Sequence, residues 1–159
     1  MRTLLLCSVI AMMACDTPTE DLNSSEQGEL RVHTVHNVQS DLVGFQLDFQ
    51  PVRCSANQAV DPNQESFALN INLVDGVFPE AIRYLDDDVD PQTRAMTTRM
   101  AIDLTGGCYD LLAVPVSNFN DQMTDFETSK DCASVELGAV NVQPARAVQA
   151  VLRTRCDNN

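Results

Sequence analysis

Asp86 to Asp90 form the densest group of ligand-type side chains in the sequence. Asp86, Asp88 and Asp90 offer carboxylate oxygens at alternate positions, and Ca²⁺ binds hard oxygen donors of this kind. The EF-hand pattern is not completed, because Pro91 stands where that loop needs glycine and Thr97 where it needs a bidentate glutamate. One interpretation is a calcium site of another kind between strands. The favoured one is a solvated acidic loop whose charges prevent pairing with other chains.

The other reactive side chains form no catalytic pattern. His33 and His36 are the only histidines in the sequence. Three residues apart on a strand, they point to opposite faces and cannot easily share a metal, so each is expected to be a partly exposed strand residue. No Gly-x-Ser-x-Gly, Gly-x-Gly-x-x-Gly, Walker or Cys-x-x-Cys motif occurs. We therefore expect no enzymatic activity and no cofactor, and a small hydrolase is the least favoured alternative.

Cys15 has the clearest chemistry in the chain. A short positive start, residues 1–3, is followed by the almost wholly apolar segment 4–13 and by the small Ala14. This segment is shorter than the ~20 residues that cross a bilayer as a helix, but it matches the ~7–15 residues of a signal-peptide core. The pattern predicts a cleaved bacterial lipoprotein signal over residues 1–14, with a diacylglyceryl-modified Cys15 as the mature N-terminus. An ordinary secretory signal, with Cys15 incidental, is the alternative.

The number of cysteines favours acylation. Of six cysteines, Cys7 would leave with the signal and an acylated Cys15 could not pair. An even set then remains, which is typical of two disulfide bonds in an oxidising compartment. Its members are Cys54, Cys108, Cys132 and Cys156. Of the three possible pairings we favour Cys108–Cys132, which would close a long loop onto its strand, with Cys54–Cys156 joining two strand ends.

The charge and length of the chain limit its partners and its architecture. The formal net charge is −13, and it becomes −14 once Arg2 leaves with the signal. A field of this sign repels phosphate backbones, so no nucleic-acid partner is expected. The part that follows the signal and tether has the length of one domain. Because tryptophan is absent, its core must consist of aliphatic side chains, methionine and phenylalanine.

The sequence divides into a tether and one β domain. Residues 15–28 are polar and acidic, which predicts a flexible tether behind the lipidated cysteine. In residues 29–159 apolar and polar side chains alternate, which is the period of half-buried strands. About seven strands are predicted, over 30–35, 43–49, 67–73, 95–104, 108–116, 133–142 and 148–156. Short strands at this spacing indicate an all-β fold, a single antiparallel β-sandwich.

Turn signals separate these strands. Gly106-Gly107 predicts a hairpin between two β-rich segments, because both glycines tolerate positive φ. Asp75-Gly76 predicts a second turn, and residues 79–85 resemble a helical turn. Recognition sites usually lie on loops carried by a rigid scaffold. The candidate binding loops are residues 55–65, 86–93 and 118–130.

The C-terminal part of the chain resembles a known type of protein. The residues that carry the resemblance are Leu104-Thr-Gly-Gly-Cys108-Tyr-Asp-Leu-Leu, Pro115, Ser129-Lys-Asp-Cys132, Val140-Asn-Val142 and a terminal strand ending at Cys156. Over residues 95–156 this pattern is similar to bacterial cell-envelope lipoproteins with a cysteine-stapled β-sandwich of the immunoglobulin-like or transthyretin-like kind. The resemblance implies a surface or periplasmic module and transfers no catalytic residues.

Taken together, the sequence predicts a non-enzymatic lipoprotein of the bacterial cell envelope, on the periplasmic or cell-surface side. Its partners would be the membrane, through the lipid on Cys15, and an unidentified protein or other envelope component bound through the loops. The alternative is a calcium-dependent adhesion or assembly module that uses the segment from Asp86 to Asp90.

Overall fold

The computed structural model describes residues 27–57, 59, 60, 62 and 64–156. These residues form strands and no helix, which confirms the all-β prediction, although there are nine strands where about seven were predicted. The strands are β1 (Gln27–Asn37), β2 (Gly44–Val52), β3 (Phe67–Asn72), β4 (Ile82–Val89), β5 (Ala95–Thr105), β6 (Gly107–Phe119), β7 (Phe126–Thr128), β8 (Val135–Val142) and β9 (Ala147–Arg153). Within the described part of the chain, no helix is long and apolar enough to span a membrane. The predicted signal, Cys15 and residues 16–26 lie outside the described residues.

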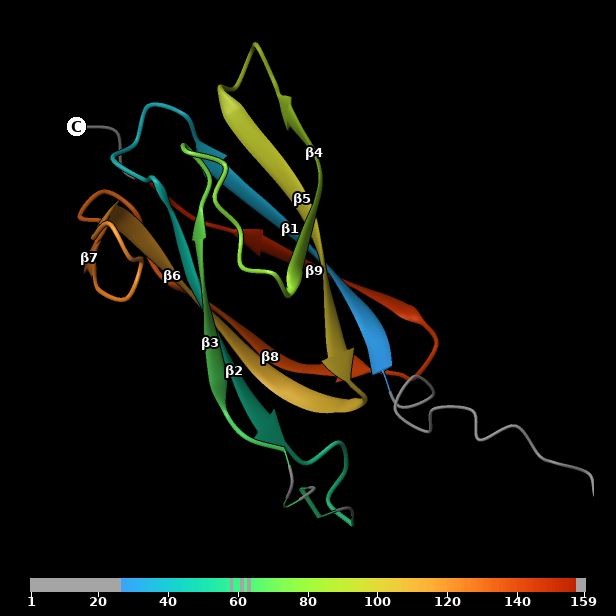
Figure 1. Cartoon of the computed structure of the whole chain (residues 1–159). Coiled ribbons are helices and arrows are strands. Elements are labelled where there is room, and N and C mark those ends of the chain that lie inside the picture. The colour runs from blue at the N-terminus through green and yellow to red at the C-terminus, as the bar shows by residue number, and fades with distance from the viewer. Residues whose placement is uncertain (1–26, 58, 61, 63, 157–159) are drawn as a thin grey trace, which may run out of the picture.

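The strands form two sheets (Figure 1). The first, sheet A, has the order β4-β5-β1-β9, and the second, sheet B, has the order β3-β2-β6, with β7 and β8 following each other along the second edge of β6. All ladders are antiparallel except that between β1 and β9, which is parallel, with Glu29 opposite Ala147 and Val35 opposite Arg153. The prediction of a purely antiparallel fold was therefore wrong at this pair. A parallel neighbour is possible there because β1 and β9 are far apart in the sequence.

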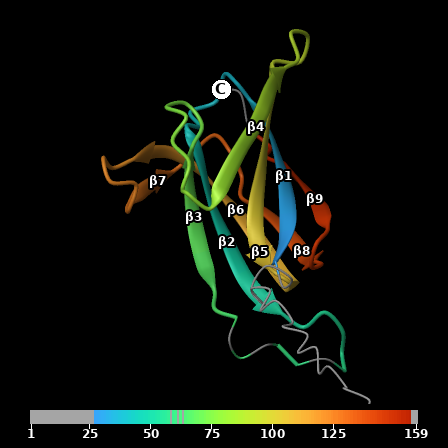
Figure 2. The same ribbon diagram turned by 45° about the vertical axis from the view of Figure 1, so that its right-hand side comes forward.

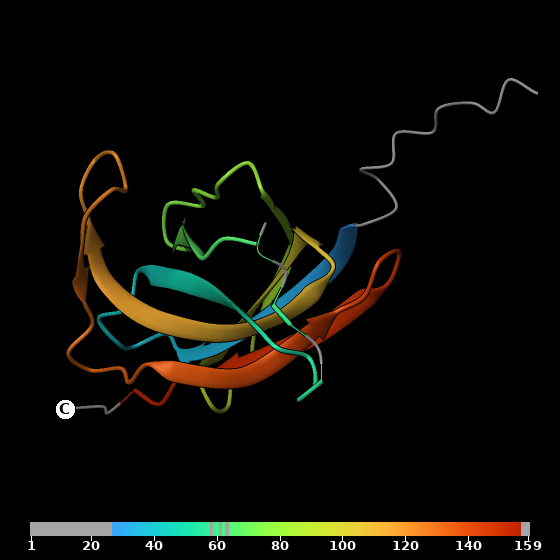
Figure 3. The same cartoon turned by 90° about the horizontal axis from the view of Figure 1, so that it is seen from below.

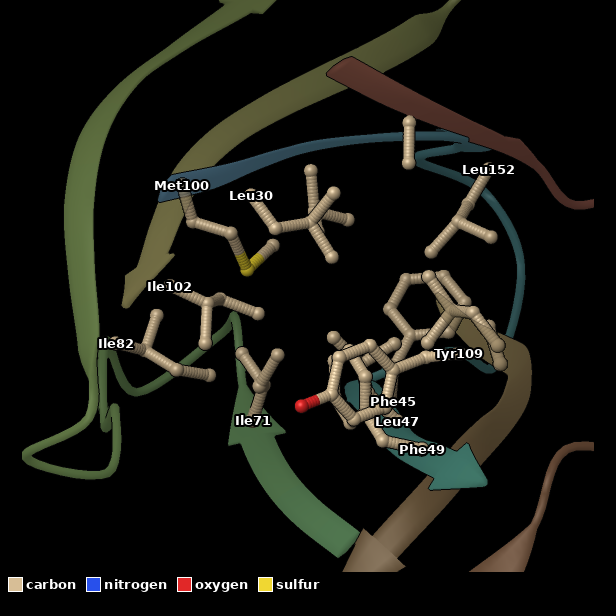
Figure 4. Packing of buried hydrophobic residues seen from close by; sticks show 14 of the residues in the cluster. Leu30, Phe45, Leu47, Phe49, Ile71, Ile82, Met100, Ile102, Tyr109 and Leu152 are labelled. Carbon is tan, nitrogen blue, oxygen red and sulfur yellow. The ribbon is translucent and has the colours of Figure 1, made fainter. Parts of the chain in front are cut away.

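The apolar residues of the two sheets pack against each other in one core (Figure 4). Alternation places every second side chain of a strand on the inner face. The largest fully buried side chains come from both sheets: Leu30, Val32, Met100, Ile102 and Leu152 from sheet A, and Phe45, Leu47, Phe49, Ile71, Leu111, Val116 and Val142 from sheet B. Tyr109 is also buried in this core, at 3% exposure.

The Gly106-Gly107 pair does not form the predicted hairpin. It carries the chain from β5 in sheet A to β6 in sheet B, and these two strands are not paired. Both edges of β5 are occupied, by β4 and β1, and both edges of β6 are occupied, by β2 and by β7 and β8. Gly107 has φ 152°, and a Cβ there would collide with the side-chain amide of Gln64. Gly107 thus allows the chain to cross between the sheets through the single residue Gly106.

The two strands that the sequence did not indicate are β4 and β7. Residues 79–85 were predicted as a helical turn, but a turn closed by the Ile82 N–H on the Pro79 carbonyl leads directly into β4. Residues 86–93 were predicted as a loop, and they begin on β4. Seven of the eight residues of β4 are exposed, so the strand carries no apolar alternation to reveal it. Strand β7, inside the predicted loop 118–130, has only three residues.

The disulfide pairing differs from the predicted one, so the pairs Cys54–Cys156 and Cys108–Cys132 were wrong. Cys54 is bonded to Cys108, and Cys132 to Cys156. The register of sheet B explains the first bond, because Val52 lies opposite Cys108 and brings the residues after β2 to the start of β6. Cys132 follows β7 in sheet B and Cys156 follows β9 in sheet A, so the second bond joins the two sheets.

The connections gather at two ends of the domain (Figure 2). We call the end at which β1 begins the entry end. It contains Gln27, its partner Thr105, the crossing at Gly106 and the connection 143–146. The opposite, far end contains residues 38–43, the β4–β5 turn and the Cys132–Cys156 bond. Figure 3 shows the strong curvature of β6, drawn in gold, between these ends.

We expect peptide mapping without reduction to recover the pairs Cys54–Cys108 and Cys132–Cys156. The Cys132→Ser/Cys156→Ser double variant should lower the free energy of unfolding by about 2–4 kcal/mol, because this bond restricts the unfolded chain. Urea unfolding of both proteins measures the change. Recovery of a Cys54–Cys156 or Cys108–Cys132 peptide would contradict the structure.

Candidate functional site

The aspartates of the predicted calcium group lie on an edge strand and not in a loop. Strand β4 is paired with β5 alone among the described strands. Asp86 lies opposite Arg99 on the outer face of sheet A, and its Oδ1 is 2.6 Å from Nη1 of Arg99. Asp88 shares that face, whereas Asp87 lies opposite Thr98 and points to the inner side. Asp86 is therefore already neutralised by a cation.

Asp90 has a structural task of its own. Its carboxylate accepts hydrogen bonds from the backbone N–H groups of Gln92, at 2.8 Å, and Thr93, at 3.3 Å, in the β4–β5 turn. These bonds stabilise the charged form and lower the pKa of Asp90. Over the described residues, no three His, Cys, Asp or Glu side chains are arranged to hold a metal ion. The structure thus distributes the three predicted ligands between an ion pair, an exposed face and a turn.

The two histidines lie on opposite faces of β1, as their spacing predicts. His33 is on the outer face and half-buried. His36 was predicted to be partly exposed, but it is on the inner face, only 6% exposed, with its ring edge-to-face against Phe45 at 6.2 Å. Burial lowers the pKa of His36, because the imidazolium form loses its hydration there. His36 is thus a neutral side chain of the core.

His36 belongs to a group of buried polar side chains that the sequence analysis missed. Thr34 and Thr98 face each other across the β1–β5 ladder, and Thr154 follows β9 with its N–H bonded to the Val35 carbonyl. The Oγ1 atoms of the three threonines and Nδ1 of His36 have no hydrogen-bond partner among the described residues. Thr34 and Thr98 each lie two residues from a buried apolar side chain, Val32 and Met100, and therefore on the same face of their strands. The alternation in the sequence could have placed both threonines in the core, but only apolar residues were assigned to it.

One of these threonines, Thr98, lines a surface groove between β4 and the β3–β4 connection. We call it the β4 groove; its volume is about 440 Å³. The groove is lined by Leu73, Val74, Asp75, Gly76, Phe78, Tyr84, Asp87, Met96 and Thr98. The rings of Phe78 and Tyr84 are in contact, with centroids 5.4 Å apart. The pKa of Tyr84 is raised by desolvation and then by the charge of Asp87, which places that carboxylate beside the phenol. The groove therefore combines apolar walls with acidic groups.

A larger cleft, of about 640 Å³, lies at the entry end between β3 and β5. Two of its polar side chains, Gln64 and Tyr109, already have hydrogen-bond partners. The Tyr109 hydroxyl donates to the Thr105 carbonyl at 2.8 Å, and Nε2 of Gln64 donates to the Gly106 carbonyl at 2.8 Å and to the Tyr109 hydroxyl at 3.2 Å. These bonds fix the sheet crossing. Both N–H donors of the Gln64 amide are thus used in holding the sheet crossing.

The predicted binding loop 118–130 is held in place at the far end. Asp41, in the β1–β2 connection, accepts hydrogen bonds from the Ser129 hydroxyl and, at 3.1 Å, from the Lys130 N–H. The Ser129 hydroxyl in turn accepts the Cys132 N–H at 2.9 Å. These bonds, above all that from Ser129, lower the pKa of Asp41. The loop therefore ends in a rigid clamp next to the Cys132–Cys156 bond.

Comparisons with models of known protein families, with curated proteins and with solved structures find no match to this chain. No residue role can therefore be transferred from a relative. All four described cysteines are held in disulfide bonds, so none of them supplies a nucleophilic thiolate. The functional argument thus depends on the sequence pattern and on the geometry of the domain.

Calcium is expected to leave the thermal midpoint unchanged when it is added at millimolar concentration to the metal-free protein. Asp86 is paired with Arg99 and Asp90 accepts two backbone N–H groups, so Asp88 alone offers an uncommitted carboxylate of the predicted three. Differential scanning calorimetry with and without CaCl₂ measures this. A calcium-specific rise that disappears in Asp88→Asn would contradict the prediction.

Burial of His36 predicts a loss of stability on acidification. Above its usual pKa of 6.5 the side chain is neutral in both states. Below that pH the unfolded chain binds a proton while the folded chain, with its lowered pKa, does not, so the free energy of unfolding falls by up to ~1.4 kcal/mol per pH unit. His36→Leu should remove this slope between about pH 6.5 and pH 5, and His33→Gln should retain it. Urea unfolding across the pH series is the measurement, and an unchanged slope in His36→Leu would disprove the assignment.

Proposed function

We propose that this protein is a non-enzymatic lipoprotein of the bacterial cell envelope, whose β domain is anchored by lipid on Cys15 and binds a partner away from the membrane. The observation that carries the proposal is the pattern of residues 1–15: a positive start, a short apolar segment, a small residue and then cysteine. Each buried acyl CH₂ contributes about 0.8 kcal/mol, so two or three chains would hold the domain durably.

The disulfide bonds support the anchor. All four cysteines that follow Cys15 are paired with one another in the folded domain. Once Cys7 leaves with the signal, Cys15 is then the one cysteine of the mature sequence outside this set. Disulfides persist in oxidising compartments, which fits a domain on the periplasmic or cell-surface side. A cysteine kept outside an otherwise complete disulfide set fits a residue that is chemically modified.

We further infer that the two sheets form a β-sandwich. The side chains of both inner faces belong to one core, and the chain passes between the sheets at residues 38–43, 73–81, 106 and 143–146. Such an arrangement gives a rigid scaffold with loops at its two ends. The immunoglobulin-like or transthyretin-like type remains a prediction of the sequence resemblance.

The position of β1 gives the anchored domain a polarity. The described domain begins with Gln27 at the entry end, so that end would lie nearest the membrane. The twelve steps from Cys15 to Gln27 reach at most about 40 Å when fully extended. Strand β1, with 11 residues, separates the far end from the entry end by roughly another 35 Å. The far end, with the β4–β5 turn and the loop 118–130, would therefore face the partner.

The anchor is tested by changing Cys15→Ser, with Cys7→Ser as the matched control. Cys15→Ser is expected to abolish the incorporation of labelled fatty acid and to move the protein from the detergent phase to the aqueous phase. Cys7→Ser should behave like the unchanged protein, because its sulfur belongs to the removed signal. Mass spectrometry of the mature N-terminus provides an independent measurement. Equal labelling of the Cys15→Ser protein would refute the proposal.

A further inference from the structure

The β4 groove lies within the main concentration of exposed apolar side chains. Eight large apolar residues of the described chain are exposed, and five of them belong to β4 or to the connection that precedes it. They are Val74, Val77, Tyr84, Leu85 and Val89. Single exposed apolar residues are normal on a protein surface, whereas a group of them beside a groove is typical of an interaction site. Figures 1 and 2 show this connection running beside β4.

The groove is bordered by a free sheet edge. Strand β4 is paired with β5 on one side and, among the described strands, with none on the other. The alternate N–H and C=O groups of such an edge can pair with an added strand. Asp86 and Asp88 lie along this edge on the outer face, and Asp87 lies on the groove side. An added β4 from a second copy would bring aspartates next to aspartates and be repelled, whereas a basic strand would be attracted.

A buried hydroxyl points independently to a ligand. Thr98 is 1% exposed and lines the β4 groove, yet its Oγ1 has no hydrogen-bond partner among the described residues. A buried polar atom without a partner costs free energy, so such atoms in a groove wall indicate a group that is supplied from outside. The acidic groups and Thr98 come from different strands, and the two observations therefore do not depend on each other.

We propose that the β4 groove is a docking site for an extended segment of a partner protein in which Lys or Arg alternates with apolar residues. The segment adds a strand to the free edge of β4. Its basic side chains on the outer face lie beside Asp88, because Asp86 is already paired with Arg99, and its apolar side chains lie beside Tyr84 and Val89. At one groove-side position the segment carries Arg in place of an apolar residue, and this long side chain passes beside Asp87 to reach Thr98. This docking site rests on the proposed function and names the class of partner. The groove is in the far half of the domain, which is the half proposed to face the partner.

The test uses the full chain and a labelled synthetic peptide that alternates Lys and Val, with one central Arg in place of a Val, and fluorescence anisotropy is the measurement. The peptide should bind saturably, and a peptide with Glu in place of Lys should not bind. N-methylation of alternate backbone nitrogens on the pairing edge should abolish binding, because strand addition needs those donors while simple attraction of charges does not. Equal binding of the N-methylated peptide would overturn the proposal.

Matched variants separate this site from the general acidity of the protein. Asp87→Asn/Asp88→Asn should weaken binding about tenfold, because each removes a charge next to the added strand. Asp103→Asn/Asp110→Asn removes the same charge from strands β5 and β6, away from the β4 edge, and should leave the affinity unchanged. Equal weakening by both double variants would show attraction by net charge and refute the site.

Two further measurements locate the peptide and keep the result independent of the anchor. Hydrogen exchange should show new protection of β4 amides on peptide addition, and Thr98→Val should weaken binding by a few-fold while leaving the exchange of free β4 unchanged. Protection elsewhere without protection of β4 would refute the site. The Cys15→Ser protein should bind the peptide as the unchanged protein does, so loss of the anchor and loss of the docking site are distinguishable outcomes.

Discussion

Strands β5 and β6 are each paired on both edges, and one residue, Gly106, joins them. Neither strand can accept the other as a neighbour, so the chain must cross from one sheet to the other at this point. The crossing sets Leu104 of β5 and Tyr109 of β6 on inner faces that share one core. The Tyr109 hydroxyl bonds back to the Thr105 carbonyl, and Gln64 packs over Gly107 where no Cβ could fit. This junction therefore carries the chain from sheet A to sheet B between two residues of the shared core and beside the entry cleft.

The two disulfide bonds secure opposite ends of this arrangement. Cys54–Cys108 lies beside the crossing at the entry end and holds the start of β6 to the residues after β2. Cys132–Cys156 lies at the far end and joins the two sheets, next to the clamp that Asp41 forms with Ser129. With β9 paired in parallel to β1, the C-terminal strand is fixed to sheet A along its length and to sheet B at its end. Between these two bonds, the described residues of the two sheets are joined by the shared apolar core.

Charge distinguishes one region of this rigid domain from the rest. On the outer face of sheet A, Glu29 bridges Arg31 and Arg83 at 2.6 Å each, above the small Ala101 that lies between the two arginines in register. Arg99 pairs with Asp86 in the same way. Exposed ion pairs of this kind contribute little to stability, but they occupy the arginines. The aspartates in the far part of β4 therefore make the free edge of this strand negatively charged.

The sequence by itself determined the β class, the alternating core strands, the Asp75-Gly76 turn and the existence of an even set of cysteines, because these follow from local period and composition. It predicted His33 and His36 on opposite faces for the same reason. Tertiary structure alone decided which cysteines pair, that Gly106-Gly107 crosses between sheets, and that Asp86 to Asp88 belong to a strand. Each of these features depends on which strands are neighbours in a sheet. Neighbours are determined by which faces of the strands are buried together and by which strand edges are already paired, and a local sequence pattern contains neither.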